Sequence, residues 1–118
     1  MPTTAEHLSK AQSNEQFAAT LGLQTSAEIE WAVTATFYAA VHYIEAYLAT
    51  RGVHSANHAQ RNRHVNGLAE TRNLWKGYGK LQRLSEKSRY WVLPVTTEDL
   101  DQARRLLSEI KRHITELL

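Results

Sequence analysis

The sequence predicts an all-α protein, an up-and-down bundle of four long helices and one short helix. Apolar residues recur at spacings of three and four over most of the chain, which is the period of an amphipathic helix. A Thr followed three residues later by Glu or Asp precedes three of the predicted helices, a pattern typical of helix N-termini. No alternating run typical of a strand exceeds four residues. We therefore expect one helical domain over residues 1–118.

The longest predicted helix, residues 26–51, should be the centre of the bundle. Thr25 and Glu28 form its predicted capping pair, and Gly52 stands where a helix C-cap would fall. Two neighbouring apolar stripes run along it, so most of its surface must be covered by other helices. The first stripe is Ile29, Val33, Phe37, Ala40 with Val41, Ile44 and Leu48, and the second is Trp31, Ala35, Tyr38, His42 and Ala46.

Two weaker helices flank this one in sequence. The first covers residues 4–21, with Thr3 and Glu6 as its capping pair and a thin apolar face. The second is short and polar, is capped by Ser55 or Asn57, and extends through residue 68. We expect both to leave much of their surface in water.

The remaining two helices complete the bundle. One spans residues 73–91, and we expect a break near Gly77 and Gly79 because glycine weakens a helix interior. The other follows the capping pair Thr96 and Asp99 and has the clearest apolar stripe in the chain. Four cations of the helix over residues 73–91 are predicted to form one ridge. We expect this ridge to face solvent, and it could also bind the backbone of RNA. The four residues are Lys76, Lys80, Arg83 and Lys87.

Composition excludes several classes of protein. The chain has no Cys, which rules out disulfides, thiolate zinc sites and a Cys nucleophile. No apolar run approaches the length of a membrane span, and the first residues lack the apolar core of a signal peptide. We therefore expect a cytoplasmic protein that does not contact a membrane.

Charge is distributed unevenly along the chain. Residues 51–93 hold nine basic and two acidic residues and three of the six His, whereas residues 1–50 hold one basic and five acidic residues. The basic block indicates either an anion site, for nucleic acid or nucleotide phosphate, or a face that docks an acidic protein. Both interpretations stay open from the sequence alone.

A candidate site follows from the polar residues of the central helix. His42 and Glu45 lie one turn apart beside Tyr38, and His42 is either a satisfied core residue or part of a pocket. We expect the basic segment to fold back over this edge, bringing imidazole and guanidinium groups together. The residues added to the site by this folding are His58, Arg61, Arg63, His64, Arg89 and Tyr90. The three Trp residues either stack on bases or, as we expect first, lie in the core or a dimer interface.

Metal binding is a weaker alternative. His54 and His58 are four residues apart and would share one face of a helix, which suits two metal ligands. There is no HExxH pattern and no fixed carboxylate nearby. We therefore predict neither a metal nor another cofactor.

The segment Phe37-Tyr38-Ala39-Ala40-Val41-His42, followed by Glu45-Ala46-Tyr47-Leu48, Gly52 and His58, resembles the second helix and following loop of HEPN domains. Leu81, Leu84 and Ser88-Arg89-Tyr90 resemble the third long helix of that family, and residues 97–110 its last helix. The resemblance covers residues 26–115. It implies a homodimeric helical bundle of the toxin or defence type that acts on RNA, or a binding-only relative associated with nucleotides. Separately from this resemblance, the basic face could dock an acidic partner such as an antitoxin or nucleotidyltransferase.

The catalytic pattern of the ribonuclease members is not matched. They carry an Arg, a polar residue and then a His four to six positions beyond the Arg, but His64 follows Arg61 more closely. In such chemistry a His moves protons at the ribose hydroxyl and an Arg holds the phosphate. A metal-independent ribonuclease using His58, His64 and Arg61, an RNA- or nucleotide-binding domain, and a protein-docking module are the alternatives.

Overall fold

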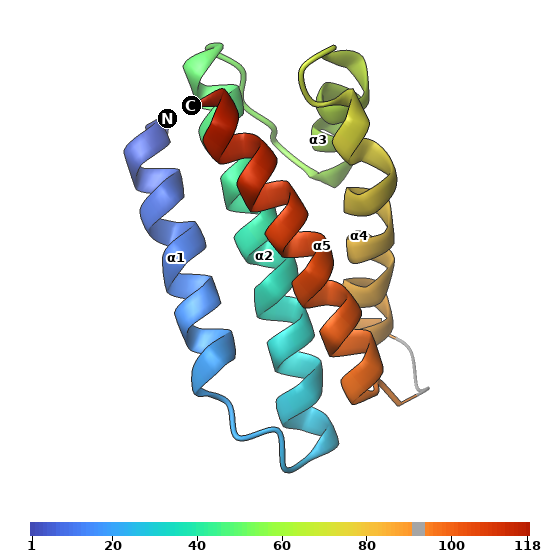
Figure 1. Cartoon of the computed structure of the whole chain (residues 1–118). Coiled ribbons are helices and arrows are strands. Elements are labelled where there is room, and N and C mark those ends of the chain that lie inside the picture. The colour runs from blue at the N-terminus through green and yellow to red at the C-terminus, as the bar shows by residue number, and fades with distance from the viewer. Residues whose placement is uncertain (91–93) are drawn as a thin grey trace.

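The chain folds around its longest helix, α2 (Ser26–Thr50), as the sequence predicts. In this computed structural model, which describes residues 1–90 and 94–118, every regular element is helical. With 25 residues, α2 is about 37 Å long, and the molecule measures 40 Å in its longest dimension. One helix therefore spans the molecule from end to end (Figure 1).

Three long helices pack against α2 in an up-and-down arrangement. They are α1 (Thr4–Thr20), α4 (Trp75–Tyr90) and α5 (Thr97–Leu117), and α5 also packs along α4. The short α3 (His58–Gly67) and a single 3₁₀ turn (Arg72–Leu74) connect α2 to α4. Both chain termini lie at the same end of the bundle, beside the C-terminal end of α2 (Figure 1). No described helix is long and apolar enough to span a membrane.

All three predicted capping pairs are present. Thr3, Thr25 and Thr96 each accept the backbone N–H three residues on, while the acidic side chain at that position accepts the N–H of the Thr. Asn57, rather than Ser55, caps α3. Gly52 follows α2 with φ of +69°, a left-handed conformation that glycine adopts without strain.

The core is built mainly on α2. Every residue from Ala32 to Leu48 is buried except Tyr38 and His42, which are half-buried. Its partners are apolar residues of the other helices, including Ala11, Tyr78, Leu81, Leu107, Ile110 and Ile114. The two incompletely buried positions are therefore the aromatic and imidazole groups that the sequence marks as candidates.

The predicted break in α4 is wrong, and so is a core position for Trp31. α4 runs unbroken through Gly77 and Gly79. A Cβ at Gly77 would lie 3.5 Å from the Cδ2 atom of Leu106, so α5 packs closely there and stabilises the helix beyond its propensity. Trp31 is 60% exposed, so it does not lie in the core of this chain, and its alternative place in a dimer interface stays a prediction. The expected end of α4 at Trp91 lies outside the described residues.

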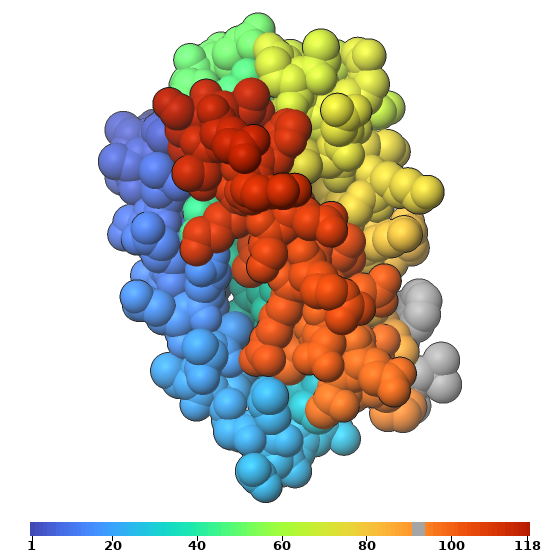
Figure 2. Space-filling model, viewed as in Figure 1, coloured from blue at the N-terminus to red at the C-terminus, as the bar shows by residue number. Residues whose placement is uncertain are grey.

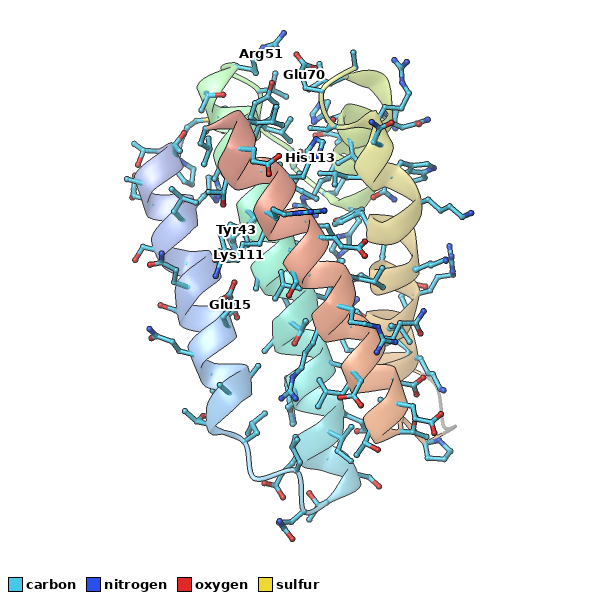
Figure 3. All side chains as sticks on the ribbon, viewed as in Figure 1. Glu15, Tyr43, Arg51, Glu70, Lys111 and His113 are labelled. Atoms are coloured by element: carbon cyan, nitrogen blue, oxygen red, sulfur yellow. The ribbon has the colours of Figure 1, made fainter. Side chains whose placement is uncertain are left out.

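Polar contacts fix the end of the bundle that holds the termini. Arg51, just beyond α2, forms an ion pair with Glu70, and His113 of α5 lies 2.7 Å from the carbonyl oxygen of Glu70. These residues come from three distant parts of the chain and meet near the C-terminus of α5 (Figure 3). The connection between α3 and α4 is thereby held against both α2 and α5.

Phe37→Ala tests the central position of α2. Phe37 is fully buried, so its truncation should lower the free energy of unfolding by about 3–5 kcal/mol. Phe17→Ala is the matched control because Phe17 is 50% exposed, and it should change stability by less than about 1 kcal/mol. Urea denaturation of both variants measures the difference. Equal effects would mean that the buried face of α2 is wrongly assigned.

Candidate functional site

A cleft of about 420 Å³ opens where the basic segment folds back on α2. Its walls come from the chain's start, the C-terminal half of α2, and the loop leading into α3. The lining residues are Met1, Pro2, His7, Val41, His42, Glu45, His54, Ser55, Ala56 and Arg61. The predicted meeting of His42 and Glu45 with the basic segment is thus present.

A buried ion pair forms one wall of the cleft. The Nε atom of Arg61 donates to Oε1 of Glu45 at 2.9 Å, and the two residues are only 8% and 5% exposed. Glu45 sits on α2, and Asn57 caps α3 so that Arg61 falls in its first turn. A lone buried charge is costly, so each residue holds the other in place. After this bond, four of the five guanidinium N–H groups remain.

His58 uses one of those four groups. Its Nδ1 lies 3.0 Å from Nη1 of Arg61, and its ring centroid lies 5.7 Å from that of Phe37. Burial, followed by the charges of Arg61 and Arg89, lowers the pKa of His58. Arginine only donates, so Nδ1 of His58 is the acceptor and the neutral ring carries its proton on Nε2. His58 therefore presents an N–H donor on its free side.

Two further imidazoles form a pair in the cleft. Nδ1 of His7 lies 3.1 Å from Nδ1 of His42. Burial lowers the pKa of both rings, to about 4 for His42, where the neighbouring charges of His7 and Lys10 act in the same direction. In a neutral pair one Nδ1 donates and the other accepts. One ring therefore keeps a bare Nε2 and the other an Nε2–H.

Arg89 reaches the same face of α2 from α4. Its Nη1 donates to the hydroxyl oxygen of Tyr38 at 2.8 Å. The guanidinium carbon lies 5.8 Å from the centre of the Phe37 ring and 5.6 Å from that of Tyr38. The guanidinium carbon of Arg89 also lies 5.0 Å from the centre of the Tyr90 ring, and Tyr90 is 72% exposed. Arg89 and Tyr38 thus extend the polar face beyond the cleft.

Other predicted residues lie apart from this cluster. His64 pairs with the hydroxyl of Ser55 at 3.0 Å and does not line the cleft. Arg63 is exposed on α3 and makes no hydrogen bond within the described residues. Of the three predicted catalytic residues, the structure brings together His58 and Arg61 but not His64.

The basic ridge of α4 is separate from the cleft. Lys76, Lys80 and Arg83 are exposed, while Lys87 pairs with Asp99 at 2.9 Å. The buried residues of α4 lie on its opposite side; they are Tyr78, Leu81, Ser85 and Ser88. The ridge therefore faces solvent, as predicted.

His7 was not predicted for the site. It is spaced three residues from Thr4 and four from Ala11, the register of the side of α1 that packs on α2. That register predicts that His7 is buried, but it does not predict that the imidazole of His42 lies opposite.

His54 lies in the loop before α3, so His54 and His58 do not share a helix face. Within residues 1–90 and 94–118, no three His, Asp or Glu side chains are placed to hold a metal ion.

A second groove lies between α1 and α5 and is visible as a hollow over α2 (Figure 2). Lys111 of α5 pairs with Glu15 of α1 at 3.1 Å, and its Nζ lies 5.7 Å from the centre of the Tyr43 ring (Figure 3). Burial and the Glu15 carboxylate raise the pKa of the Tyr43 phenol. The charges of Lys111 and Glu15 neutralise each other. This favours a structural role for Lys111, Glu15 and Tyr43.

Comparison with models of known protein families gives no match, and comparison with curated proteins gives none either. The likeness to HEPN domains therefore depends on the short motifs in the sequence.

The low pKa of His42, which is paired with His7, predicts that the free energy of unfolding falls in acid. The pKa of His42 is about 4 in the folded chain, below the ordinary 6.5, so the unfolded chain binds more protons between those values. Stability should be fully present above pH 6.5 and decline as the pH falls towards 4. His42→Gln should make this decline shallower in urea denaturation at a series of pH values. Identical pH dependence in both proteins would contradict the assignment.

Proposed function

We propose that this chain is a HEPN-like domain that binds RNA or a nucleotide, with a phosphate group at the cleft formed by α2, α3 and the N-terminal residues. The observation that carries the proposal is Arg61, a buried guanidinium that lines the cleft. Glu45 and His58 fix its orientation through Nε and Nη1, so its Nη2 group takes no part in these two hydrogen bonds. A guanidinium held in this way is preorganised for phosphate, because less side-chain freedom is lost on binding.

The surrounding groups support binding of an anion. His58 does not line the cleft but holds Arg61 in place, and Lys10 lies close enough to the cleft for its charge to lower the pKa of His42. Glu45 is the one carboxylate that lines the cleft, and it is neutralised by Arg61. A phosphate would therefore meet donors and a nearby cation rather than a free negative charge.

The same hydrogen bonds favour binding over cleavage. A general base needs a bare ring nitrogen, but Nδ1 of His58 is occupied by Arg61 and its Nε2 carries the proton. A neutral imidazole is also a poor proton donor to a leaving group. His64, the other predicted catalytic His, is paired with Ser55 and does not itself line the cleft. We therefore assign His58 and Arg61 to binding.

A metal-independent ribonuclease is the second candidate, and one observation favours it. The His7–His42 pair leaves one bare ring nitrogen, which is the group a base must supply. The homodimer implied by the HEPN resemblance and the acidic protein partner expected from the basic face stay predictions, and light scattering over a range of concentrations tests the homodimer.

Binding should be strongly dependent on salt. We expect the protein to bind a fluorescent single-stranded RNA octamer in low salt and to lose affinity steeply as salt rises. Glu45→Gln/Arg61→Gln removes the cation without leaving a buried charge unpaired. It should weaken binding about tenfold, the cost of losing a hydrogen bond to a charged group.

Arg104→Gln is the control for this measurement, because Arg104 is exposed on α5 and lines the other groove. It should change the affinity by much less than the double variant. Absence of RNA or nucleotide binding by the unmodified protein at low salt would refute the proposed function.

Cleavage is tested by incubating the same RNA with the protein in excess chelator. We expect the RNA to remain intact, since His58 lacks a bare nitrogen for the proton transfer. Products ending in a cyclic phosphate, abolished in His42→Ala but not in His58→Ala, would instead establish a ribonuclease that uses the His7–His42 pair. Electrophoresis of the RNA distinguishes these results.

A further inference from the structure

A separate cleft of about 330 Å³ lies between the N-terminal half of α2 and the end of α4. It is lined by Glu30, Trp31, Thr34, Ser88 and Arg89. Thr34 and Ser88, both buried, bond to each other at 2.7 Å, and Ser88 also donates to the carbonyl oxygen of Ser85. These hydroxyl groups are therefore satisfied within the protein. The lining residues that remain to contact a ligand are Glu30, Trp31 and Arg89.

Trp31 offers a flat apolar face at this cleft. It is 60% exposed, although the next six residues of its helix, Ala32 to Phe37, are all buried. Exposing an indole forgoes much of the stabilisation that its burial would give. An exposed aromatic ring beside a guanidinium suits stacking with another flat ring, for which nucleobases are the common partner of RNA-binding proteins.

The two charged groups of the cleft are not paired with each other. Within the described residues, the side chain of Glu30 makes no hydrogen bond or ion pair. Both of its carboxylate oxygens are therefore available as acceptors. Arg89 donates from Nε to Ser85 and from Nη1 to Tyr38, which leaves its Nη2 group available. The cleft thus offers an acceptor pair, a donor pair and a stacking surface.

This cleft shares a face of α2 with the Arg61 cleft. Trp31, Thr34, Tyr38, His42 and Glu45 follow spacings of three and four, which places them along one side of the helix. The distance along the helix axis from Trp31 to Glu45 is about 21 Å, a length that a few nucleotides can span. Arg89 stands between the ends, since it contacts Tyr38 and lines the Trp31 cleft.

We propose that the Trp31 cleft binds a guanine base of the single-stranded RNA whose phosphate lies at Arg61. This inference rests on the proposed function and adds a base-selecting subsite to it. Guanine carries two adjacent donors, N1–H and the 2-amino group, that match the carboxylate of Glu30. Its acceptors O6 and N7 match the donors of Arg89. Adenine, cytosine and uracil lack this combination of donors and acceptors, so the cleft should prefer guanine.

The test compares RNA octamers by fluorescence anisotropy at low salt. One octamer contains only uridine, the second has a single central guanosine, and the third has inosine at that position, which lacks the 2-amino group. The protein should bind the guanosine octamer about tenfold more tightly than the uridine octamer, the discrimination expected from one bidentate contact to a base edge. Inosine should fall between them because it retains N1–H.

Three variants locate the subsite. Trp31→Ala should remove the preference for guanosine without changing the affinity for the uridine octamer, and Trp31→Phe should keep most of the preference. Glu30→Gln should abolish the discrimination between guanosine and inosine. Glu109→Gln, an equal change of charge at an exposed position of α5, is the matched control and should alter nothing.

Equal binding of all three octamers by the unmodified protein would overturn the guanine subsite while leaving the proposed function intact. So would a Trp31→Ala variant that keeps the preference, or one that shifts a dimer to a monomer in light scattering, since Trp31 would then be an interface residue. No binding to any octamer would refute the proposed function itself, and the subsite with it.

Discussion

The buried contact between Glu45 and Arg61 is the constraint on which the rest of the site depends. Glu45 lies on a helix whose neighbouring positions are almost all buried, and an unpaired carboxylate there would cost several kcal/mol. Arg61 must therefore reach it from α3. The only other buried residue of α3 is Val65, so this helix has little apolar packing to hold it. The ion pair fixes where the basic segment lies.

That placement sets the chemistry of the histidines. Once Arg61 is held against α2, its charge lowers the pKa of His58 and contributes to the low pKa of His42. Neutral imidazoles that share hydrogen bonds present fixed donors and acceptors instead of mobile positive charge. The contact between Glu45 and Arg61 thus fixes the position of α3, and the charge of Arg61 adds to burial, the largest cause of the low pKa of both His58 and His42.

Local signals predicted the helices well, because a capping pair or an apolar period is written in consecutive residues. The capping pair of Thr25 and Glu28 and the left-handed Gly52 are examples. The meeting of His42, Glu45 and Arg61 could also be anticipated, since a polar edge on a buried helix needs a partner. His7 could not, because the three-residue register of a weakly amphipathic helix does not say which side chain lies opposite. A core position for Trp31 was wrong for the same reason. Periodicity assigns a residue to a face of the helix but does not say whether another helix covers that end of the face.

The distribution of charge explains why a ligand should bind one side of α2 and not the other. On the side facing α5, Glu15 and Lys111 already pair with each other, so a ligand that binds either of them would have to break an existing ion pair, and Arg104 is the remaining charged residue of that groove. On the opposite side, Arg61 keeps spare donors after pairing, and Glu30 and Arg89 line one cleft without contacting each other. Unused donors and acceptors are what a polar ligand can satisfy at little cost. The face from Trp31 to Glu45 is therefore the side of the bundle on which recognition is least opposed by the protein's own interactions.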